Sequence, residues 1–221
     1  MTDAEQLKHF INEFIDEINN GDFIKVYGML LMRSPAKIRI FTDMMYRSGI
    51  DVIQYLNGIP NHFYEKICPW TTLDLPAHIR SISNYAFGEC EKLKEVTSLN
   101  VSVLDSSCFA YCYNLEKITF GSLYNIGDGV FQSCYALKTV SLPDSLRIIG
   151  NSAFAHCETL KSIDVKRVGI IGEHAFENCY NLEEVKYAGR MFDWKDVCEE
   201  GVFDGCKKLK KITCKDGDIQ L

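Results

Sequence analysis

The sequence lacks several features that would have pointed to a class of protein. No uninterrupted apolar run approaches the roughly 20 residues that span a bilayer. The N-terminus, Met1–Glu5, is polar and acidic, without the positive start and apolar core of a secretory signal, so we expect a chain located in the cytoplasm or within an assembled particle. Positive charge is not in excess either, because 24 Lys and Arg residues stand against 30 Asp and Glu, a formal net charge of −6. That balance argues against a nucleic-acid binder, which needs a basic face.

Motifs for catalysis and for metal or cofactor binding are missing as well. There is no phosphate-binding glycine loop and no Cys-x-x-Cys pair with zinc-ligand spacing. No histidine stands in a recognisable motif with a nucleophile. The five histidines are His9, His62, His78, His156 and His174. We therefore expect a non-enzymatic protein that holds no metal and no cofactor.

A repeat dominates the chain from about residue 56 onward. Four positions recur with the spacing Phe-x-x-Cys-x-x-Leu-x-x-(Ile/Val), hereafter the repeat frame. The frame phenylalanines are separated by 22 or 23 residues, and by 27 before the last one. A weaker copy built on Tyr64 precedes them, so we count seven coils. The six full copies contain Phe87, Phe109, Phe131, Phe154, Phe176 and Phe203.

The length of the repeat predicts a solenoid. A unit of about 22 residues cannot bury an apolar face alone, whereas stacked copies form a continuous core. The Leu-x-x-Ile segment has the spacing of an inward-facing strand that pairs in parallel with the same segment of the next coil. The segment before it, for example Gly150 to Cys157, predicts a short helical turn on the convex side. The predicted fold is an α/β solenoid with a parallel concave sheet of about seven coils.

The run from Leu142 to Cys157, LPDSLRIIGNSAFAHC, resembles the repeat of the BspA-like, or Treponema-type, leucine-rich repeat family. The resemblance covers residues 56–221. It implies a leucine-rich repeat solenoid that binds ligands or serves as a scaffold, as in bacterial surface proteins and in parasite and bacteriophage proteins. It also implies a closing repeat, or C-terminal cap, at about residues 187–221. The motif is specific for the fold and unspecific for function.

Residues 1–55 contain no copy of the repeat frame and predict a separate small helical domain. Apolar residues from Leu7 to Ile18 follow a helical stripe, and Ser34-Pro35 opens a further helix. Two roles stay open for this domain. It is either a cap that covers the first coil or a docking domain that ties the solenoid to a larger assembly. The predicted domains are therefore residues 1–55 and 56–221.

Six of the ten cysteines occupy one position of the repeat frame. Side chains stacked in parallel register favour contact over bonding, although neighbouring coils stand only about 5 Å apart. We expect buried free thiols, each filling a small apolar slot. The six are Cys90, Cys112, Cys134, Cys157, Cys179 and Cys206.

Outward positions on the predicted strands are the candidates for binding, because they can vary without disturbing the core. Lysines and acids mix along them, which suits a protein partner with its own charge pattern better than DNA. The alternative is that these charges pair laterally on a solvated face. The candidate binding residues are Lys94, Glu95, Glu116, Lys117, Lys138, Lys161, Asp164, Glu183, Glu184, Lys210 and Lys211.

The predicted function is protein–protein interaction through rigid display of that surface. One alternative is a structural component of a larger particle, such as a phage virion, docked by the N-terminal domain. A second is a surface adhesin, which would require export. We expect a protein partner, no nucleic acid and no membrane span, and the sequence does not predict the oligomeric state.

Overall fold

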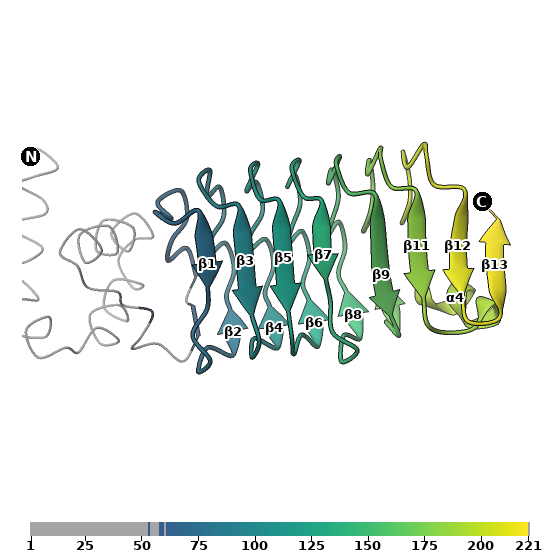
Figure 1. Ribbon diagram of the computed structural model, residues 1–221, viewed down its shortest axis with the longest axis horizontal. Helices are drawn as coiled ribbons and strands as arrows, with labels where there is room; N and C mark the ends of the chain where they lie inside the picture. Colours follow the sequence, from purple (N-terminus) through teal and green to yellow (C-terminus); the bar gives the residue numbers. More distant parts are fainter. Residues whose placement is uncertain (1–52, 54–57, 60, 221) are drawn as a thin grey trace, which may run out of the picture. The chain divides into compact units, whose positions relative to one another are not determined.

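The computed structural model describes residues 53, 58–59 and 61–220 (Figure 1). The chain from Asn57 to Leu221 forms a compact unit of its own. The predicted helical domain, residues 1–55, lies outside the described residues except for Ile53. Its existence and its role as cap or docking domain therefore stay predictions.

Seven strands formed by the Leu-x-x-Ile segments lie in parallel along one side of this unit, and their outward surface is hereafter the strand face (Figure 1). Except between β7 and β9, each is in register with the next, as where Glu95 lies opposite Lys117 and Lys117 opposite Thr139. The strands are β1 (Thr72–Asp74), β3 (Glu95–Ser98), β5 (Lys117–Phe120), β7 (Thr139–Ser141), β9 (Ser162–Lys166), β11 (Glu184–Tyr187) and β12 (Lys211–Cys214).

Five two-residue strands form a second parallel sheet, in the order β10-β8-β6-β4-β2. They are β2 (Ser81–Ile82), β4 (Val103–Leu104), β6 (Asn125–Ile126), β8 (Ile148–Ile149) and β10 (Ile170–Ile171). Five turns of the solenoid thus carry both kinds of strand. The helix α4 (Met191–Val197) and the antiparallel strand β13 (Gly217–Gln220) follow near the C-terminal end. The predicted parallel leucine-rich repeat solenoid is confirmed.

The segment around each phenylalanine of the repeat frame is a series of turns. The prediction of a short helical turn in this segment is wrong. Two residues before and two residues after each ring the backbone takes a left-handed conformation, with φ of 54° at Tyr85 and 55° at Glu89. A right-handed helix cannot continue through such residues. The left-handed positions are Tyr85, Ser107, Gly129, Ser152, His174 and Gly201 before the ring, and Glu89, Tyr111, Ser133, His156, Asn178 and Gly205 after it.

These turns join each coil to the next through backbone hydrogen bonds. The Phe87 amide donates to the Cys108 carbonyl at 2.8 Å, and the Glu89 amide donates to the Ala110 carbonyl at 2.8 Å. The amide between them, that of Gly88, bonds instead within its own coil, to Tyr85. Alternate amides therefore point along the solenoid axis, which a helix would not allow because its amides all bond within the helix.

A glycine opens this turn segment in three copies, and close packing between coils is the reason. A Cβ atom at Gly150 would lie 2.6 Å from the carbonyl carbon of Gly127 in the preceding coil. Gly172 meets Gly150 in the same way, at 2.8 Å. Real Cβ atoms do not approach backbone this closely, so these positions require glycine for space.

The core is a stack of aromatic rings, one for each coil. Phe131 lies parallel to Phe109 with ring centroids 5.8 Å apart, and next to Phe154 at 5.2 Å. The stack begins at Tyr64, which replaces phenylalanine in the weak first copy and lies 5.3 Å from Phe87. Its last repeat-frame ring is Phe203, 5.6 Å from Phe176. The spacing of the rings is slightly larger than the roughly 4.8 Å between neighbouring strands, so each coil contributes one ring and one strand to the stack.

The strand face is interrupted at one junction. Strands β1, β3, β5 and β7 form one sheet, and β9 begins a separate sheet with β11, β12 and β13. Figure 1 shows the wider gap between β7 and β9. Val140 of β7 is only half-buried, although the inward residues at its frame position in the other copies are buried. The amide of Phe131 still donates to Ala153 at 2.7 Å across this junction, and β8 still pairs with β10. The turns and the short strands therefore hold the stack where strand pairing is broken.

Replacing Phe131 by alanine tests whether the ring stack is the core. The side chain is fully buried between two neighbours, so Phe131→Ala should lower the free energy of unfolding by about 3–5 kcal/mol. Chemical denaturation followed by circular dichroism measures the change. Tyr124→Ala is the control, because the Tyr124 side chain is 55% exposed, and its loss should stay below about 0.5 kcal/mol. A loss below about 1 kcal/mol for Phe131→Ala would contradict the assignment.

Candidate functional site

The predicted binding residues lie in two adjacent rows along the strand face. The first row is the position directly after the frame leucine, and the amides of Glu116, Lys138 and Glu183 donate to the carbonyl of the row member before them, as from Glu116 to Lys94 at 2.8 Å. The second row is the next position, which begins most strands. The first row is Lys94, Glu116, Lys138, Lys161, Glu183 and Lys210, and the second contains Glu95, Lys117, Glu184 and Lys211. Asp164 lies two residues further along, within β9.

Lateral ion pairs join neighbouring coils in both rows. Lys117 Nζ lies 3.4 Å from the Glu95 carboxylate of the preceding coil. Lys138 Nζ lies 3.0 Å from the Glu116 carboxylate in the same manner. A hydrogen bond from Lys138, supported by its charge, lowers the pKa of the Glu116 carboxyl group. Lateral pairing, the alternative that the sequence left open, therefore describes part of this face.

The remaining predicted residues divide into paired and unpaired groups. Asp164 binds Lys166 at 3.2 Å, and Glu184 binds Lys186 at 3.4 Å. Lys211 Nζ lies 2.7 Å from the Asp218 carboxylate on β13, which raises the pKa of the lysine and lowers that of the acid. Within the part of the chain that the structure describes, Lys94, Lys161, Glu183 and Lys210 make no ion pair within 4.0 Å.

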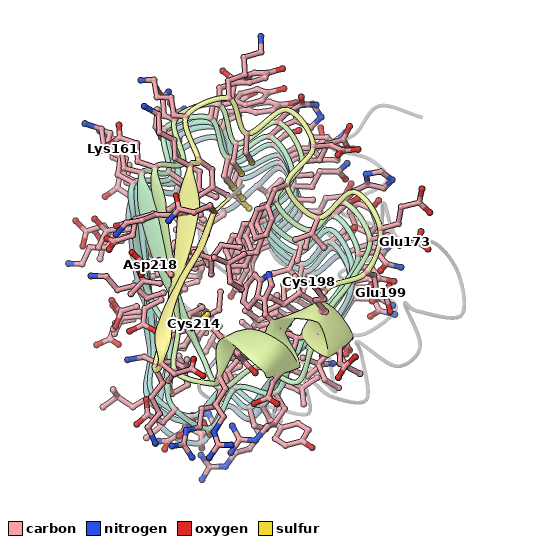
Figure 2. The ribbon with its side chains drawn as sticks, turned by 90° about the vertical axis from the view of Figure 1, so that its right-hand side faces the viewer. Lys161, Glu173, Cys198, Glu199, Cys214 and Asp218 are labelled. Atoms are coloured by element: carbon pink, nitrogen blue, oxygen red, sulfur yellow. The ribbon has the colours of Figure 1, made fainter. Side chains whose placement is uncertain are left out.

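Figure 2 shows the solenoid from the end at which β13 lies. Lys161 and Asp218 stand on the side of the strand face, and Glu173 and Glu199 stand on the opposite side. Glu173 and Glu199 lie close together, because the Glu173 amide donates to the Glu199 carboxylate at 3.2 Å. The two sides of the solenoid thus present separate sets of charges.

Sequence reasoning missed several residues that shape the strand face. Lys166 comes from β9 and reaches Asp144 of the preceding coil at 3.6 Å, so it bridges the junction where the sheet is interrupted. Asp218 was missed because β13 lies outside the repeat frame. Lys207 and Lys208 were missed because they precede the frame leucine, although four lysines within Lys207–Lys211 are visible in the sequence.

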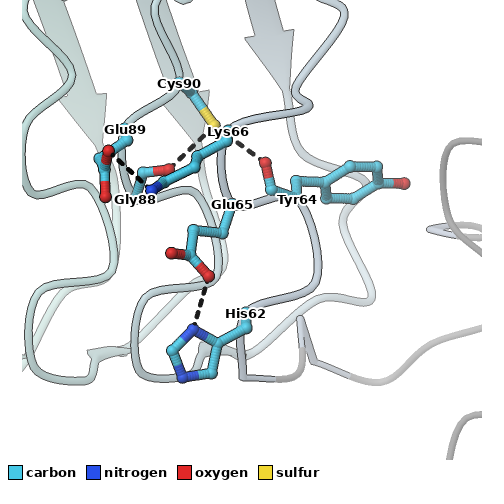
Figure 3. Close-up of polar contacts among 7 residues, drawn as sticks. All are labelled: His62, Tyr64, Glu65, Lys66, Gly88, Glu89 and Cys90. Carbon is cyan, nitrogen blue, oxygen red and sulfur yellow. Dashed lines mark hydrogen bonds and ion pairs between the residues drawn. The ribbon is translucent and has the colours of Figure 1, made fainter. Parts of the chain in front are cut away.

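The frame cysteines do more than fill apolar slots. The Cys112 thiol donates a hydrogen bond to the Phe87 carbonyl of the preceding coil at 3.1 Å, and the other frame cysteines repeat this contact at distances up to 3.4 Å. Figure 3 shows the first member, in which the Cys90 thiol lies 3.1 Å from the Tyr64 carbonyl. Nearby, Lys66 pairs with Glu89 at 3.1 Å, and His62 bonds to Glu65 at 2.8 Å.

All ten cysteines are free thiols. Burial raises the pKa of the Cys90, Cys134 and Cys157 thiols, since an apolar interior disfavours the charged thiolate. Burial also raises the pKa of Cys198, outside the frame, to about 12. In these sites the protonated thiol is the stable form, and it is the form that can donate to a carbonyl group.

The last coil contains a hollow next to α4. It has a volume of about 330 Å³ and is lined by both apolar and acidic side chains, including Val202, Phe203 and Asp204. Trp194 of α4 stacks on Phe203 with ring centroids 6.2 Å apart and meets Tyr187 edge-on at 5.0 Å. The aromatic stack thus continues into α4 at this end.

Neither a metal site nor a membrane-spanning helix is present in residues 53, 58–59 and 61–220. No cluster of three or more His, Cys, Asp or Glu side chains there has the geometry to hold a metal ion. In the same residues, no helix has the length and apolar character needed to cross a bilayer.

Comparison with known proteins agrees with this geometry. The family model of the BspA type leucine rich repeat region matches six copies over residues 57–183. The chain belongs to the BspA-type leucine-rich repeat family. As a BspA-type repeat protein it has the framework of a class suited to protein interaction. No curated protein matches the chain.

Two solved structures are similar to this BspA-type chain. A leucine-rich repeat protein from Bacteroides ovatus is 26% identical, with a TM-score of 0.61 over 71% of this chain and 40% of that protein. The leucine-rich repeat protein of T. pallidum is 23% identical, with a TM-score of 0.59 over 67% of this chain and 72% of that protein. The chain therefore spans about two fifths of the Bacteroides ovatus protein, and the second likeness concerns the fold alone.

Thiol labelling tests the account of the cysteines in this BspA-type solenoid. A raised pKa leaves little reactive thiolate, so the native protein should react slowly at about pH 8. Cys206 should react first, because it is half-buried and a side-chain hydrogen bond with Cys179 lowers its pKa. Denatured protein should expose all ten thiols. Mass spectrometry of alkylated peptides gives the order of modification. Rapid labelling of Cys134 and Cys157 in native protein, or disulfides between frame cysteines, would contradict the account.

Proposed function

We propose that this chain is a non-enzymatic protein-interaction module whose partner docks on the strand face. The two charged rows would make the contact, through Lys94, Glu95, Glu116, Lys117, Lys138, Lys161, Asp164, Glu183, Glu184, Lys210 and Lys211. The unpaired members, such as Lys94 and Lys161, are available to a partner without first breaking an ion pair.

The observation that carries the proposal is the separation of the rows from the core. Lys138 and Lys161 are exposed, whereas the frame leucines directly before them are completely buried. Backbone hydrogen bonds between coils fix much of the face before any partner arrives. A surface held in this way loses little conformational freedom on binding, which lowers the cost of association.

Charge reversal on the strand face tests the proposal. Lys138→Glu with Lys161→Glu should leave folding intact and weaken binding to a partner recovered from the native host. The loss should fall mainly on the association rate and should depend on salt, because exposed charges at the rim of an interface steer the encounter. Biolayer interferometry at two salt concentrations measures both effects.

Two comparisons make this experiment decisive. Arg80→Glu with Arg167→Glu changes the net charge equally, at exposed positions outside both rows, and should bind as the unmodified protein does. A chain lacking residues 1–55, with its fold verified by circular dichroism, measures the contribution of the N-terminal segment. If the Lys138 and Lys161 variant binds normally and the truncated chain does not, the N-terminal segment holds the binding site and the proposal fails.

A further inference from the structure

Between its frame cysteine and the end of its strand, the last coil carries more lysines than any other coil. Between Cys206 and Cys214 the sequence carries four lysines and no Asp or Glu. The equivalent stretch of the first full copy, residues 90–98, carries two lysines and two glutamates. All four lysines of the last coil are exposed. They are Lys207, Lys208, Lys210 and Lys211.

Within the part of the chain that the structure describes, only one of these four lysines forms an ion pair. Lys211 pairs with Asp218, whereas Lys208 Nζ contacts the neutral side-chain oxygen of Asn181 at 2.7 Å. Lys207 Nζ lies 5.6 Å from the centre of the Tyr180 ring. These contacts position the ammonium groups without neutralising them, since neither an amide nor a ring carries a negative charge. The local charge therefore stays positive on a chain that is acidic overall.

The four lysines surround a groove. It has a volume of about 620 Å³, and its other lining residues are Glu183 and Gln220. Lysines placed around one concavity can approach a carboxylate from several directions, which isolated surface lysines cannot do. The one acid in the groove, Glu183, leaves an excess of three positive charges among the lining residues.

Few acids lie near these lysines. On the earlier coils a lysine pairs with the glutamate of the preceding coil, as Lys138 pairs with Glu116. In the last coil Lys210 follows Glu183 in the same row, yet neither makes an ion pair within 4.0 Å in the described part of the chain. After β12 the chain turns back into β13, which pairs antiparallel and contributes Asp218 as the partner of Lys211.

We propose that this lysine groove binds an acidic segment of a protein partner, with two or more Asp or Glu side chains placed over Lys208 and Lys210. The inference rests on the proposed interaction function and names the partner chemistry for one part of the surface. A nucleic acid fits the groove less well. Glu183 lies within it, and the acids of the neighbouring coils would repel a continuous phosphate backbone.

The test uses the full chain and a defined probe, a fluorescein-labelled peptide of about 12 residues built from Glu-Glu-Leu triplets. Lys208→Glu with Lys210→Glu should weaken binding by about tenfold or more in fluorescence anisotropy at low salt, because attraction becomes repulsion. Lys208→Gln with Lys210→Gln, which only removes the charges, should show a smaller loss. Raising the salt from about 50 to about 200 mM should also weaken binding.

The chain provides a control with the same change of charge. Arg80 and Arg167 are exposed and lie outside both rows and outside the groove. Arg80→Glu with Arg167→Glu changes the net charge by the same amount and should leave peptide binding within about twofold of the unmodified protein. Equal loss in both double variants would overturn the inference, because it would show a response to net charge alone.

Other outcomes separate this inference from the proposed function. Failure of the peptide to bind the unmodified protein at low salt would overturn the lysine groove. Tighter binding of a single-stranded DNA 12-mer than of the peptide would overturn it in favour of a nucleic acid. If the host partner responds to the Lys138 and Lys161 reversal but the peptide ignores the Lys208 and Lys210 reversal, the strand-face function stands and the lysine groove fails.

Discussion

Stacking of one aromatic ring per coil upon the next is the interaction on which the rest of the solenoid depends. The rings repeat at centroid spacings of 5.2–5.8 Å from Tyr64 to Phe203, which fixes the distance between coils. At that distance the amides of the turns reach carbonyl groups of the next coil, and each frame thiol reaches the carbonyl of the preceding ring residue. The glycines at 150 and 172 allow the backbones to approach this closely. The rings, the turns and the thiols together hold the coils at this spacing, and they are hereafter called the frame of the solenoid.

This frame leaves the strand face free to serve another purpose. At the junction of β7 and β9 the sheet is interrupted, yet the turns on either side stay hydrogen-bonded. Since the frame carries the stack there, outward side chains on the strands contribute little to holding coils together. Ion pairs such as Lys117 with Glu95 are exposed, and exposed pairs contribute at most about 1 kcal/mol each. The charged residues of this face can therefore differ with little loss of stability, which leaves them available for contact with a partner.

Much of the fold could be predicted, because a repeated sequence imposes a repeated structure. The spacing of the frame residues was enough to place the strands, their register and the buried rings and thiols. The left-handed turns were not predicted. Glycine at positions 129, 201 and 205 indicated them, but the three-residue spacing of Phe and Cys was interpreted as a helical turn. The thiol–carbonyl bonds could not be predicted, since they depend on the path of those turns. The interruption between β7 and β9 was not predicted, although the spacing of 23 residues between Phe131 and Phe154 makes this coil one residue longer than its neighbours. For the candidate site, the sequence placed the rows but not Asp218 or Lys166, which lie outside the frame.

Native-state hydrogen exchange at the interrupted junction tests most directly whether the frame holds the solenoid together. The amides of Phe131 and Ser133 cross this junction to Ala153 and Ala155, and those of Phe109 and Tyr111 cross the preceding, uninterrupted one. If the frame carries the stack, both sets should exchange only through global unfolding, with protection factors equal within about tenfold. If the amides of Phe131 and Ser133 exchange more than about a hundredfold faster, strand pairing holds the coils together and the account is wrong.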